Sequence, residues 1–351
     1  MKRIQVTASK NYEVLVGRGL LRDLGAYIKE LTKAQKVAVI SDSNVWPIFG
    51  EKALKSLENA GFSKIVSYVF PAGEESKNGE TYLSLLNFLA TEKLTRSDCI
   101  IALGGGVVGD MTGFAAATYL RGIDYIQVPT TVLAAVDSSV GGKTAIDLAS
   151  GKNLVGAFYQ PRLVLCDIDT LDTLPQDIFR DGCAEIIKYG VLYDPQLFSH
   201  LEENGLDFDR EWVISRCIEL KRDVVAEDEF DRGERQKLNL GHTIGHSIEA
   251  NSHYALSHGK AVAIGMAIVS RAAAQLGLCD KGTASAIEAI LQRFQLPTAT
   301  SDTAGAIYEG ALSDKKRFGG VVNLIVPTKI GNCIIHTVTV EELKTFIEAG
   351  L

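Results

Sequence analysis

Short apolar segments alternate with helical patterns through the first half of the chain, and this alternation limits the fold more than any other feature. Five apolar, β-rich runs occur there: KVAVISD (36–42), KIVSYVF (64–70), CIIALGG (99–105), YIQVPTT (125–131) and LVLCDID (163–169). Helical patterns such as EKALKSLENAG and ETYLSLLNFLATEK separate several of them. Strands that are apolar along their whole length and alternate with helices are typical of a parallel sheet covered on both faces. The opening segment, RIQVTASKNYEVLVGRG, predicts an antiparallel hairpin.

The pattern changes after Leu174, where runs of helical period replace the strands. These runs are CAEIIKYGVL, WVISRCIELKRDVVAEDE, GHTIGHSIEA, GKAVAIGMAIVSRAAAQLG and TASAIEAILQRF. A late hairpin is predicted in VVNLIVPTKIGNCIIHTV. We therefore expect an α/β domain over residues 1–174 and a mainly α-helical domain over residues 175–351.

Composition narrows the class of protein. The formal net charge of −7 weighs against a nucleic-acid partner, although a local basic pocket could still hold a small anion. No apolar run approaches the roughly 18 residues that a membrane span needs, and MKRIQVTASK lacks the apolar core of an export signal. None of the six cysteines forms a CxxC pair, which favours buried, reduced thiols. We expect a cytoplasmic protein without a membrane partner.

A glycine-rich turn follows the third of these strands. In ALGGGVVGDMTGF, Gly104, Gly106 and Gly109 form a G-x-G-x-x-G pattern between a predicted strand and a predicted helix. Such a turn lets backbone N–H groups approach a pyrophosphate at the helix N-terminus. The alternative is a tight strand–helix turn without a ligand, and Asp110 could be a helix cap or a contact to a nucleotide.

A loop-rich, polar stretch follows the next strand, in VPTTVLAAVDSSVGGKTAIDLASGKNLVGAFYQP. GGKT resembles the end of a P-loop, but the first glycine of that motif is replaced by Asp137, so we reject a nucleotide-hydrolysing P-loop. Lys143 and Lys152 on a glycine-rich backbone suit phosphate or carboxylate recognition. A solvated surface loop is the alternative.

Histidines and a carboxylate in the second half suggest a metal site. His242 and His246 are four residues apart, so in a helix both rings leave one face, and His258 follows soon after. Glu185 lies in an apolar helical pattern, where an unpaired carboxylate would be costly. These ligands suit zinc or a similar ion. Each histidine alone is more often structural, and the metalloprotease motif HEXXH is absent.

Positively charged side chains accompany the proposed ligands. Lys188 follows Glu185 by three residues and shares its helix face. A cation next to a metal, in an acidic protein, points to an anionic substrate.

Taken together, these blocks resemble the 3-dehydroquinate synthase family over essentially the whole chain. The most specific blocks are PAGEESK, ALGGGVVGDMTGFAAATYLRG, QVPTTVLAAVDSSVGGKTAID, GKNLVGAFYQP, CAEIIKYG, LNLGHTIGHSIEA and LSHGKAVAIGMA. The resemblance implies a Rossmann-like N-terminal domain that binds NAD and a helical C-terminal domain, in a homodimer. It implies conversion of 3-deoxy-D-arabino-heptulosonate 7-phosphate to 3-dehydroquinate and phosphate, in the shikimate route to aromatic amino acids. NAD would be reduced and reoxidised within one turnover, with a divalent metal, Zn²⁺ or Co²⁺.

The resemblance also implies a role for particular residues. The metal ligands would be Glu185, His242 and His258. The NAD contacts would be Asp42, Glu74, Lys77, Gly105, Gly106, Val107, Asp110, Thr130, Thr131, Asp137, Lys143, Lys152, Thr170, Leu171 and Thr173. The substrate and catalytic residues would be Arg121, donated across the dimer, and Lys152, Asn153, Lys188, Lys221, Arg235, Asn239, His246 and one of Lys315 or Lys316.

Three other hypotheses stay open at this point. A sister sugar phosphate cyclase would share the metal and NAD blocks and differ at the substrate contacts. A metal-dependent polyol dehydrogenase would release NADH and would not need so many cations. A non-catalytic NAD- or metal-binding module would show no turnover.

Overall fold

The computed structural model describes residues 1–253, 255–315 and 320–351. The chain divides into two compact units, and each is described by itself. The first contains Met1–Leu174 and Lys221–Phe230, and the second contains Pro175–Leu220 and Asp231–Leu351. The short segment Lys221–Phe230 belongs to the first unit although it follows Leu174 in the sequence. A single boundary after Leu174 therefore does not describe the division completely.

The first unit is built on a seven-stranded sheet with the order β1-β2-β9-β6-β5-β3-β4. β1 and β2 pair antiparallel, which confirms the opening hairpin, and all the other neighbours in this sheet are parallel. The strands are β1 (Lys2–Val6), β2 (Tyr12–Gly17), β3 (Lys36–Asp42), β4 (Lys64–Phe70), β5 (Cys99–Gly104), β6 (Asp124–Pro129) and β9 (Leu163–Asp167). The five strands expected from the apolar runs are all present.

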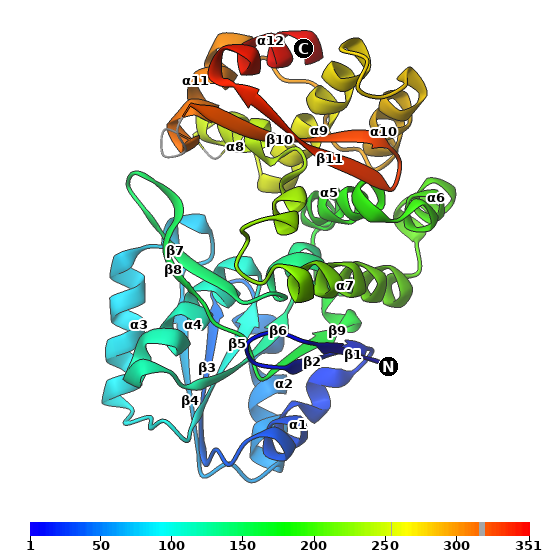
Figure 1. The fold of residues 1–351 in the computed structure, drawn as a ribbon. Helices are drawn as coiled ribbons and strands as arrows, with labels where there is room; N and C mark the ends of the chain where they lie inside the picture. The colour runs from blue at the N-terminus through cyan, green and yellow to red at the C-terminus, as the bar shows by residue number, and fades with distance from the viewer. Residues whose placement is uncertain (254, 316–319) are drawn as a thin grey trace. The chain divides into compact units, whose positions relative to one another are not determined.

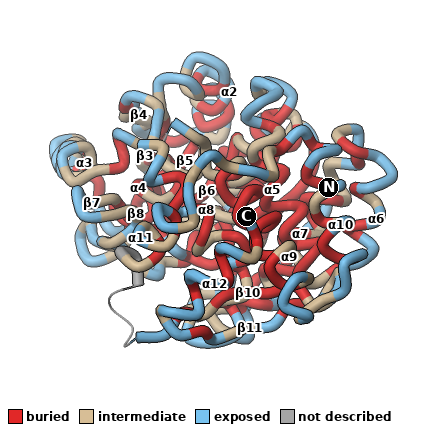
Figure 2. Tube along the Cα trace, turned by 90° about the horizontal axis from the view of Figure 1, so that it is seen from above, coloured by how far each residue is buried: buried red, intermediate tan, exposed pale blue. Residues whose placement is uncertain are grey.

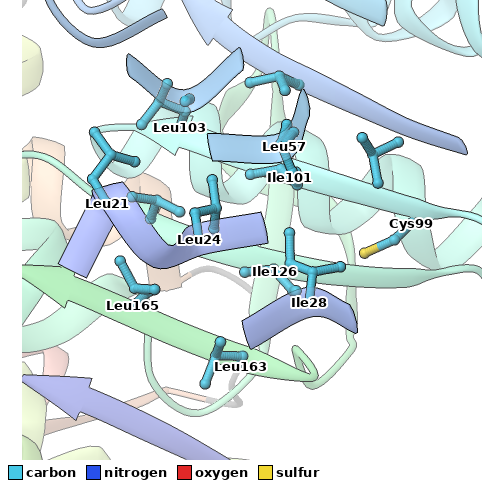
Figure 3. Packing of buried hydrophobic residues seen from close by; sticks show 14 of the residues in the cluster. Leu21, Leu24, Ile28, Leu57, Cys99, Ile101, Leu103, Ile126, Leu163 and Leu165 are labelled. Carbon is cyan, nitrogen blue, oxygen red and sulfur yellow. The ribbon is translucent and has the colours of Figure 1, made fainter. Parts of the chain in front are cut away.

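Helices cover both faces of this sheet (Figure 1). They are α1 (Leu24–Leu31), α2 (Trp46–Asn59), α3 (Gly79–Thr91) and α4 (Gly106–Thr118). On one face, Leu24 and Ile28 of α1 and Leu57 of α2 pack on Ile101 and Ile126 (Figure 3). On the other, α3 and α4 pack on the alternate strand residues, such as Ile100 and Ala102. Because successive strand residues point to opposite faces, continuous apolar strands supply both cores.

The polar stretch after β6 differs from the loop expected there. Its second half forms an antiparallel hairpin of β7 (Lys143–Leu148) and β8 (Gly151–Phe158). Thr144, Ala145 and Ile146 are buried in it. β7 lies close to α4, where a Cβ on Gly113 would be only 2.4 Å from Cγ2 of Thr144. The hairpin buries Ala145 and Ile146 of KTAIDL, which a solvated loop would leave exposed, whereas Leu148 stays exposed.

The second unit is mainly helical. Its helices are α5 (Gln176–Tyr193), α6 (Pro195–Asn204), α8 (His242–Asn251), α9 (His258–Gln275), α10 (Lys281–Arg293), α11 (Ala304–Lys315) and α12 (Val340–Gly350). α7 (Arg210–Glu227) contributes to both units. The expected late hairpin is present as β10 (Val321–Lys329) and β11 (Asn332–Thr339). α9 is buried along most of its length, as Figure 2 shows. The expected fold class, a Rossmann-like parallel sheet followed by a helical part, is confirmed.

All six cysteines lie among the described residues and none of them forms a disulfide; five are buried, as expected for structural thiols. Within the part of the chain that the structure describes, no helix combines the length and the apolar character needed to cross a bilayer.

Candidate active site

In the second unit, α5 carries a buried ion pair. Glu185 and Lys188 are three residues apart on one face of the helix, each side chain is 1% exposed, and Lys188 Nζ contacts Glu185 Oε2. Neither carboxylate oxygen of Glu185 accepts a hydrogen bond of normal geometry from the described residues. Burying a carboxylate without such donors is costly, and a metal cation, in addition to Lys188, would offset that cost.

Two histidines from other helices face this carboxylate. Nε2 of His242, at the start of α8, is 3.5 Å from Glu185 Oε1, and Nε2 of His258, at the start of α9, is 3.4 Å from the same oxygen. The other ring nitrogen of His242 lies 3.0 Å from the carbonyl oxygen of Leu240. α8 and α9 approach closely here because Gly241, Gly245 and Gly265 leave no side chain between them.

These three donors fit a divalent metal. A tetrahedral ion with bonds of about 2.1 Å separates its ligand atoms by about 3.4 Å, close to the distances found. One carboxylate with two imidazoles is a donor set that suits zinc and cobalt. The three ligand atoms lie within 4.8 Å of one another. Glu185, His242 and His258 are therefore brought together as the sequence predicted, on α5, α8 and α9.

His246 lies beside this cluster and is more exposed. Its ring centroid is 5.3 Å from that of His242 and 5.8 Å from that of His258. It belongs to a second group with metal-ligand spacing, formed with Glu249 and His258. Helical spacing alone could not decide whether His242 and His246 share one metal, whereas the structure groups His242 with Glu185 and His258, and His246 with Glu249 and His258.

The pKa values of the two histidines that face Glu185 are shifted in opposite directions. Burial, followed by the positive charge of Lys188, holds the pKa of His242 well below its usual value. Burial acts the same way on His258, but the carboxylates of Glu185 and Glu249 outweigh it and raise the pKa of His258 to about 10. In the metal-free protein, His258 thus carries the proton that a metal must displace.

The first unit gathers another set of predicted residues. Lys77 Nζ donates to Asp110 Oδ2 and to Asn153 Oδ1, both at 2.6 Å, and Lys77 is 4% exposed. Glu74 Oε1 lies 3.8 Å from Lys77 Nζ and 3.6 Å from Lys152 Nζ. Burial raises the pKa of Asp110, and on Lys77 the carboxylates of Asp110 and Glu74 outweigh burial and raise its pKa. Asp110 lies in the second turn of α4, so it pairs with Lys77 and does not cap the helix.

The glycine turn connects β5 to α4 as expected. Gly105 precedes the helix and Gly106 begins it. A Cβ on Gly105 would lie 3.1 Å from Thr131 Cγ2, and one on Gly106 would lie 3.3 Å from Ser138 Oγ, so side chains there would crowd the turn. The hydroxyl of Thr130 is buried and has no hydrogen-bond partner among the described residues. The turn therefore offers a helix N-terminus with close backbone access, which fits a dinucleotide.

Several predicted contacts are engaged locally. Asp42 accepts hydrogen bonds from the backbone of Asn44 and Val45. In the 3₁₀ helix that includes Leu171, Thr170 and Thr173 donate to backbone carbonyls. Lys221 Nζ donates to the carboxylate of Asp137 and, at 2.5 Å, to its carbonyl. These contacts are all within the protein, so a cofactor role for Asp42, Asp137, Thr170 and Thr173 stays a prediction.

The remaining predicted residues differ in exposure. Arg235 is 1% exposed, whereas Asn239, Lys143 and Arg121 are exposed. Arg121 has a positive φ of 65°, in a left-handed turn with Leu120. Val107 lies in the first turn of α4. Lys315 is the last residue of α11, and Lys316 lies outside the described residues.

Three acidic residues near these clusters were missed. Glu249 lies three residues after His246 and seven after His242, a spacing that places all three on one helix face. Asp181 lies one turn before Glu185 on α5 and accepts hydrogen bonds from the start of α9. Asp147 accepts the backbone N–H of Asn153. Only Glu249 carried a signal in the sequence.

The fold is that of the sugar phosphate cyclase class. The chain aligns over 100% of both chains, with 27% identity and a TM-score of 0.90, with 2-deoxy-scyllo-inosose synthase complexed with carbaglucose-6-phosphate, NAD⁺ and Co²⁺. It aligns over 99% of its length and 98% of the other chain, with 25% identity and a TM-score of 0.87, with 2-epi-5-epi-valiolone synthase from Streptomyces hygroscopicus with NAD⁺ and Zn²⁺ bound.

Within this class, the chain belongs to the 3-dehydroquinate synthase family. The family model for the N-terminal part of 3-dehydroquinate synthase matches residues 67–181, and that for the C-terminal part matches residues 182–317. The 3-dehydroquinate synthase of Clostridium acetobutylicum is 43% identical over 99% of both chains. The resemblance expected from the sequence blocks is thus confirmed, and the chain is an enzyme of this type.

Proposed function

We propose that the chain converts 3-deoxy-D-arabino-heptulosonate 7-phosphate to 3-dehydroquinate and phosphate at a centre whose metal ligands are Glu185, His242 and His258. The observation that most directly supports this proposal is the buried Glu185 carboxylate, which faces two imidazole Nε2 atoms and contacts Lys188. NAD and a divalent metal are the cofactors of this family, and the reaction belongs to the route to aromatic amino acids.

When bound, the metal polarises the oxygen on the reacting carbon, and NAD accepts and returns a hydride. The chain's residues supply binding, orientation and proton transfer. Lys188 is a buried cation fixed by Glu185, and Arg235 is buried in the same unit, so both suit the negative charges of a phosphorylated sugar acid. Lys152, Asn153, Lys221, Asn239 and one of Lys315 or Lys316 complete the proposed substrate set.

His246 is the proposed proton-transfer group. It lies next to His242, groups with Glu249 and His258, and is exposed enough to exchange a proton with solvent or substrate. Imidazole is suited to this task because its ordinary pKa lies near neutral pH.

The first unit is the proposed NAD site. The glycine turn at Gly105 and Gly106 offers the helix N-terminus to the pyrophosphate, and the buried hydroxyl of Thr130 lacks a partner among the described residues. The charged group of Glu74, Lys77 and Asp110 lies in the same unit as this turn. The other proposed cofactor contacts are Asp42, Val107, Thr131, Asp137, Lys143, Lys152, Thr170, Leu171 and Thr173.

A homodimer is part of the proposal. Arg121 is exposed and held in a left-handed turn, a strained conformation of the kind found at functional sites. It is the residue that we propose reaches the substrate phosphate of the partner subunit. A cytoplasmic location likewise stays a prediction.

A turnover experiment with limiting NAD tests the activity. Enzyme, heptulosonate phosphate and sub-stoichiometric NAD should release many phosphates per NAD, with no net NADH. A polyol dehydrogenase would instead accumulate one NADH per substrate oxidised. Chelation should abolish phosphate release, and added Zn²⁺ or Co²⁺ should restore it, which a non-catalytic module would not show.

A sister cyclase is the second candidate, favoured by the TM-score of 0.90 to 2-deoxy-scyllo-inosose synthase. The higher identity to a 3-dehydroquinate synthase, 43% against 27%, supports the first proposal. Comparing phosphate release from the heptulosonate phosphate with that from glucose 6-phosphate separates the two.

A further inference from the structure

A second carboxylate lies behind the proposed metal centre. Glu249, on α8, is 4% exposed, and its Oε2 is 3.4 Å from Nδ1 of His258. Nε2 of the same ring is 3.4 Å from Oε1 of Glu185. The imidazole of His258 thus lies between two buried carboxylates, one at each ring nitrogen.

The two proposed histidine ligands differ in the group that contacts their Nδ1 atom. Nδ1 of His242 faces a neutral backbone carbonyl, that of Leu240, at 3.0 Å. Nδ1 of His258 faces a full negative charge. A ring nitrogen that donates to a carboxylate leaves the opposite nitrogen bare and makes it a stronger donor to a metal.

We propose that Glu249 is a positioning residue that accepts the Nδ1–H of His258, fixes the ring's tautomer and orientation, and thereby strengthens metal binding. This inference rests on the proposed metal site. It assigns Glu249 no contact with substrate, NAD or the metal itself.

The charges at the centre support this assignment. The negative charge of Glu185 is matched by Lys188, with which it forms an ion pair. A bound dication would therefore bring uncompensated positive charge into a buried region, which is unfavourable. The carboxylate of Glu249 supplies negative charge on the far side of a ligand, where it offsets the ion without occupying a coordination position.

Metal affinity of the full-length protein is the decisive measurement. Metal-free protein is titrated with Co²⁺ and with Zn²⁺ against a chelating dye, and the visible spectrum of the Co²⁺ form is recorded. The variants are Glu249→Gln, which keeps the size and an acceptor oxygen but removes the charge, and Glu249→Ala. Glu288→Gln is the matched control, because Glu288 pairs with Arg271 and not with a histidine.

We expect Glu249→Gln to weaken metal binding about 10-fold and Glu249→Ala up to about 100-fold, the range for residues behind a ligand. The Co²⁺ spectrum at saturation should keep its bands in Glu249→Gln, since the ligand set is unchanged. Glu288→Gln should bind within about twofold of the parent. Thermal unfolding of the metal-free variants identifies any that fail to fold, and Glu249→Gln then carries the test.

Two results would overturn the inference. One is an unchanged metal affinity in both Glu249 variants. The other is altered Co²⁺ bands or a lost second equivalent of metal, which would make Glu249 a ligand together with His246 and His258. Glu185→Gln, measured in parallel, tests the proposed metal centre itself. If this variant binds metal as tightly as the parent, the proposed centre is wrong, whatever the Glu249 variants show.

Discussion

The carboxylate of Asp181 accepts the hydroxyl hydrogen of Ser257 at 2.5 Å, and this contact ties α5 to the start of α9. The same carboxylate accepts the backbone N–H groups of Gly259 at 3.2 Å and Lys260 at 2.9 Å. Ser257 precedes α9 but makes no capping bond of its own. Asp181 therefore caps this helix from a neighbouring one, and the residue it fixes between these contacts is His258, a proposed metal ligand.

Removing this cap should loosen the metal centre. Asp181→Ala deletes the contacts to Ser257, Gly259 and Lys260, and we expect the protein to lose about 2 kcal/mol of stability. Metal affinity should fall as well, since His258 then lies in a frayed first turn. Thermal unfolding and a Co²⁺ titration measure the two effects. Asp181→Asn, which keeps one acceptor oxygen, should lose less of both, and a variant with parental metal affinity would contradict the link to His258.

A close backbone approach at the same turn makes a second prediction. A Cβ on Gly259 would lie 1.9 Å from the carbonyl oxygen of Asp181, a distance that no side chain can accept. Gly259→Ala should separate α5 from α9, lower the midpoint of thermal unfolding by several degrees and weaken metal binding. Gly305→Ala is the control, because the nearest atom to its Cβ would be Oγ1 of Thr303 at 3.9 Å. Equal behaviour of the two variants would rule out crowding as the cause.

The sequence predicted the strands better than the polar stretch between them. Apolar runs such as 36–42 and 99–105 correspond to β3 and β5, because burial on both faces leaves a continuous apolar signal. The hairpin of β7 and β8 was missed because its polar and glycine residues carry a turn-like composition. Its strand character depends on packing against α4, which is a tertiary contact.

The candidate site was likewise predicted from the sequence only in part. The histidine spacing and Glu185 predicted a metal centre, and the fold brings His242 and His258 to that carboxylate from separate helices. The sequence could not separate His242 from His246 without the resemblance, because both share a helix face. Asp181 could not be found at all, since its role comes from the approach of α9, about 76 residues later in the chain.

His242 and His246 should respond differently to the same substitution. His242→Ala removes an imidazole that faces Glu185, so we expect loss of metal and of activity together. His246→Ala should retain one metal per chain and lose activity by about 10²- to 10⁴-fold, the usual contribution of a general acid or base. Metal content after dialysis and phosphate release measure the two effects. Equal loss of metal in both variants would restore the interpretation in which both rings bind one ion.

Metal binding should strengthen as pH rises. The pKa of His258 is raised to about 10 in the metal-free protein, so near neutral pH the ring is protonated and must release that proton to bind an ion. Affinity should rise about tenfold per pH unit below that value, with about one proton released per metal from this group. The same raised pKa stabilises the metal-free fold fully below the unfolded pKa of His, and this stabilisation is lost as pH rises toward 10. Calorimetric titration in buffers of different ionisation enthalpy counts the protons, and binding without proton release at neutral pH would contradict the expectation.

Lys77 and Asp110 allow structural and cofactor roles to be separated in the first unit. Lys77→Met leaves the partly buried Asp110 carboxylate without the cation 2.6 Å away, and we expect a loss of about 2 kcal/mol. Adding Asp110→Asn removes the uncompensated charge, so the double variant should recover most of that stability. NAD affinity should stay weak in the double variant if the charged pair contacts the cofactor. Thermal unfolding and fluorescence titration with NADH give the two quantities, and a double variant that binds NADH like the parent would limit this pair to a structural role.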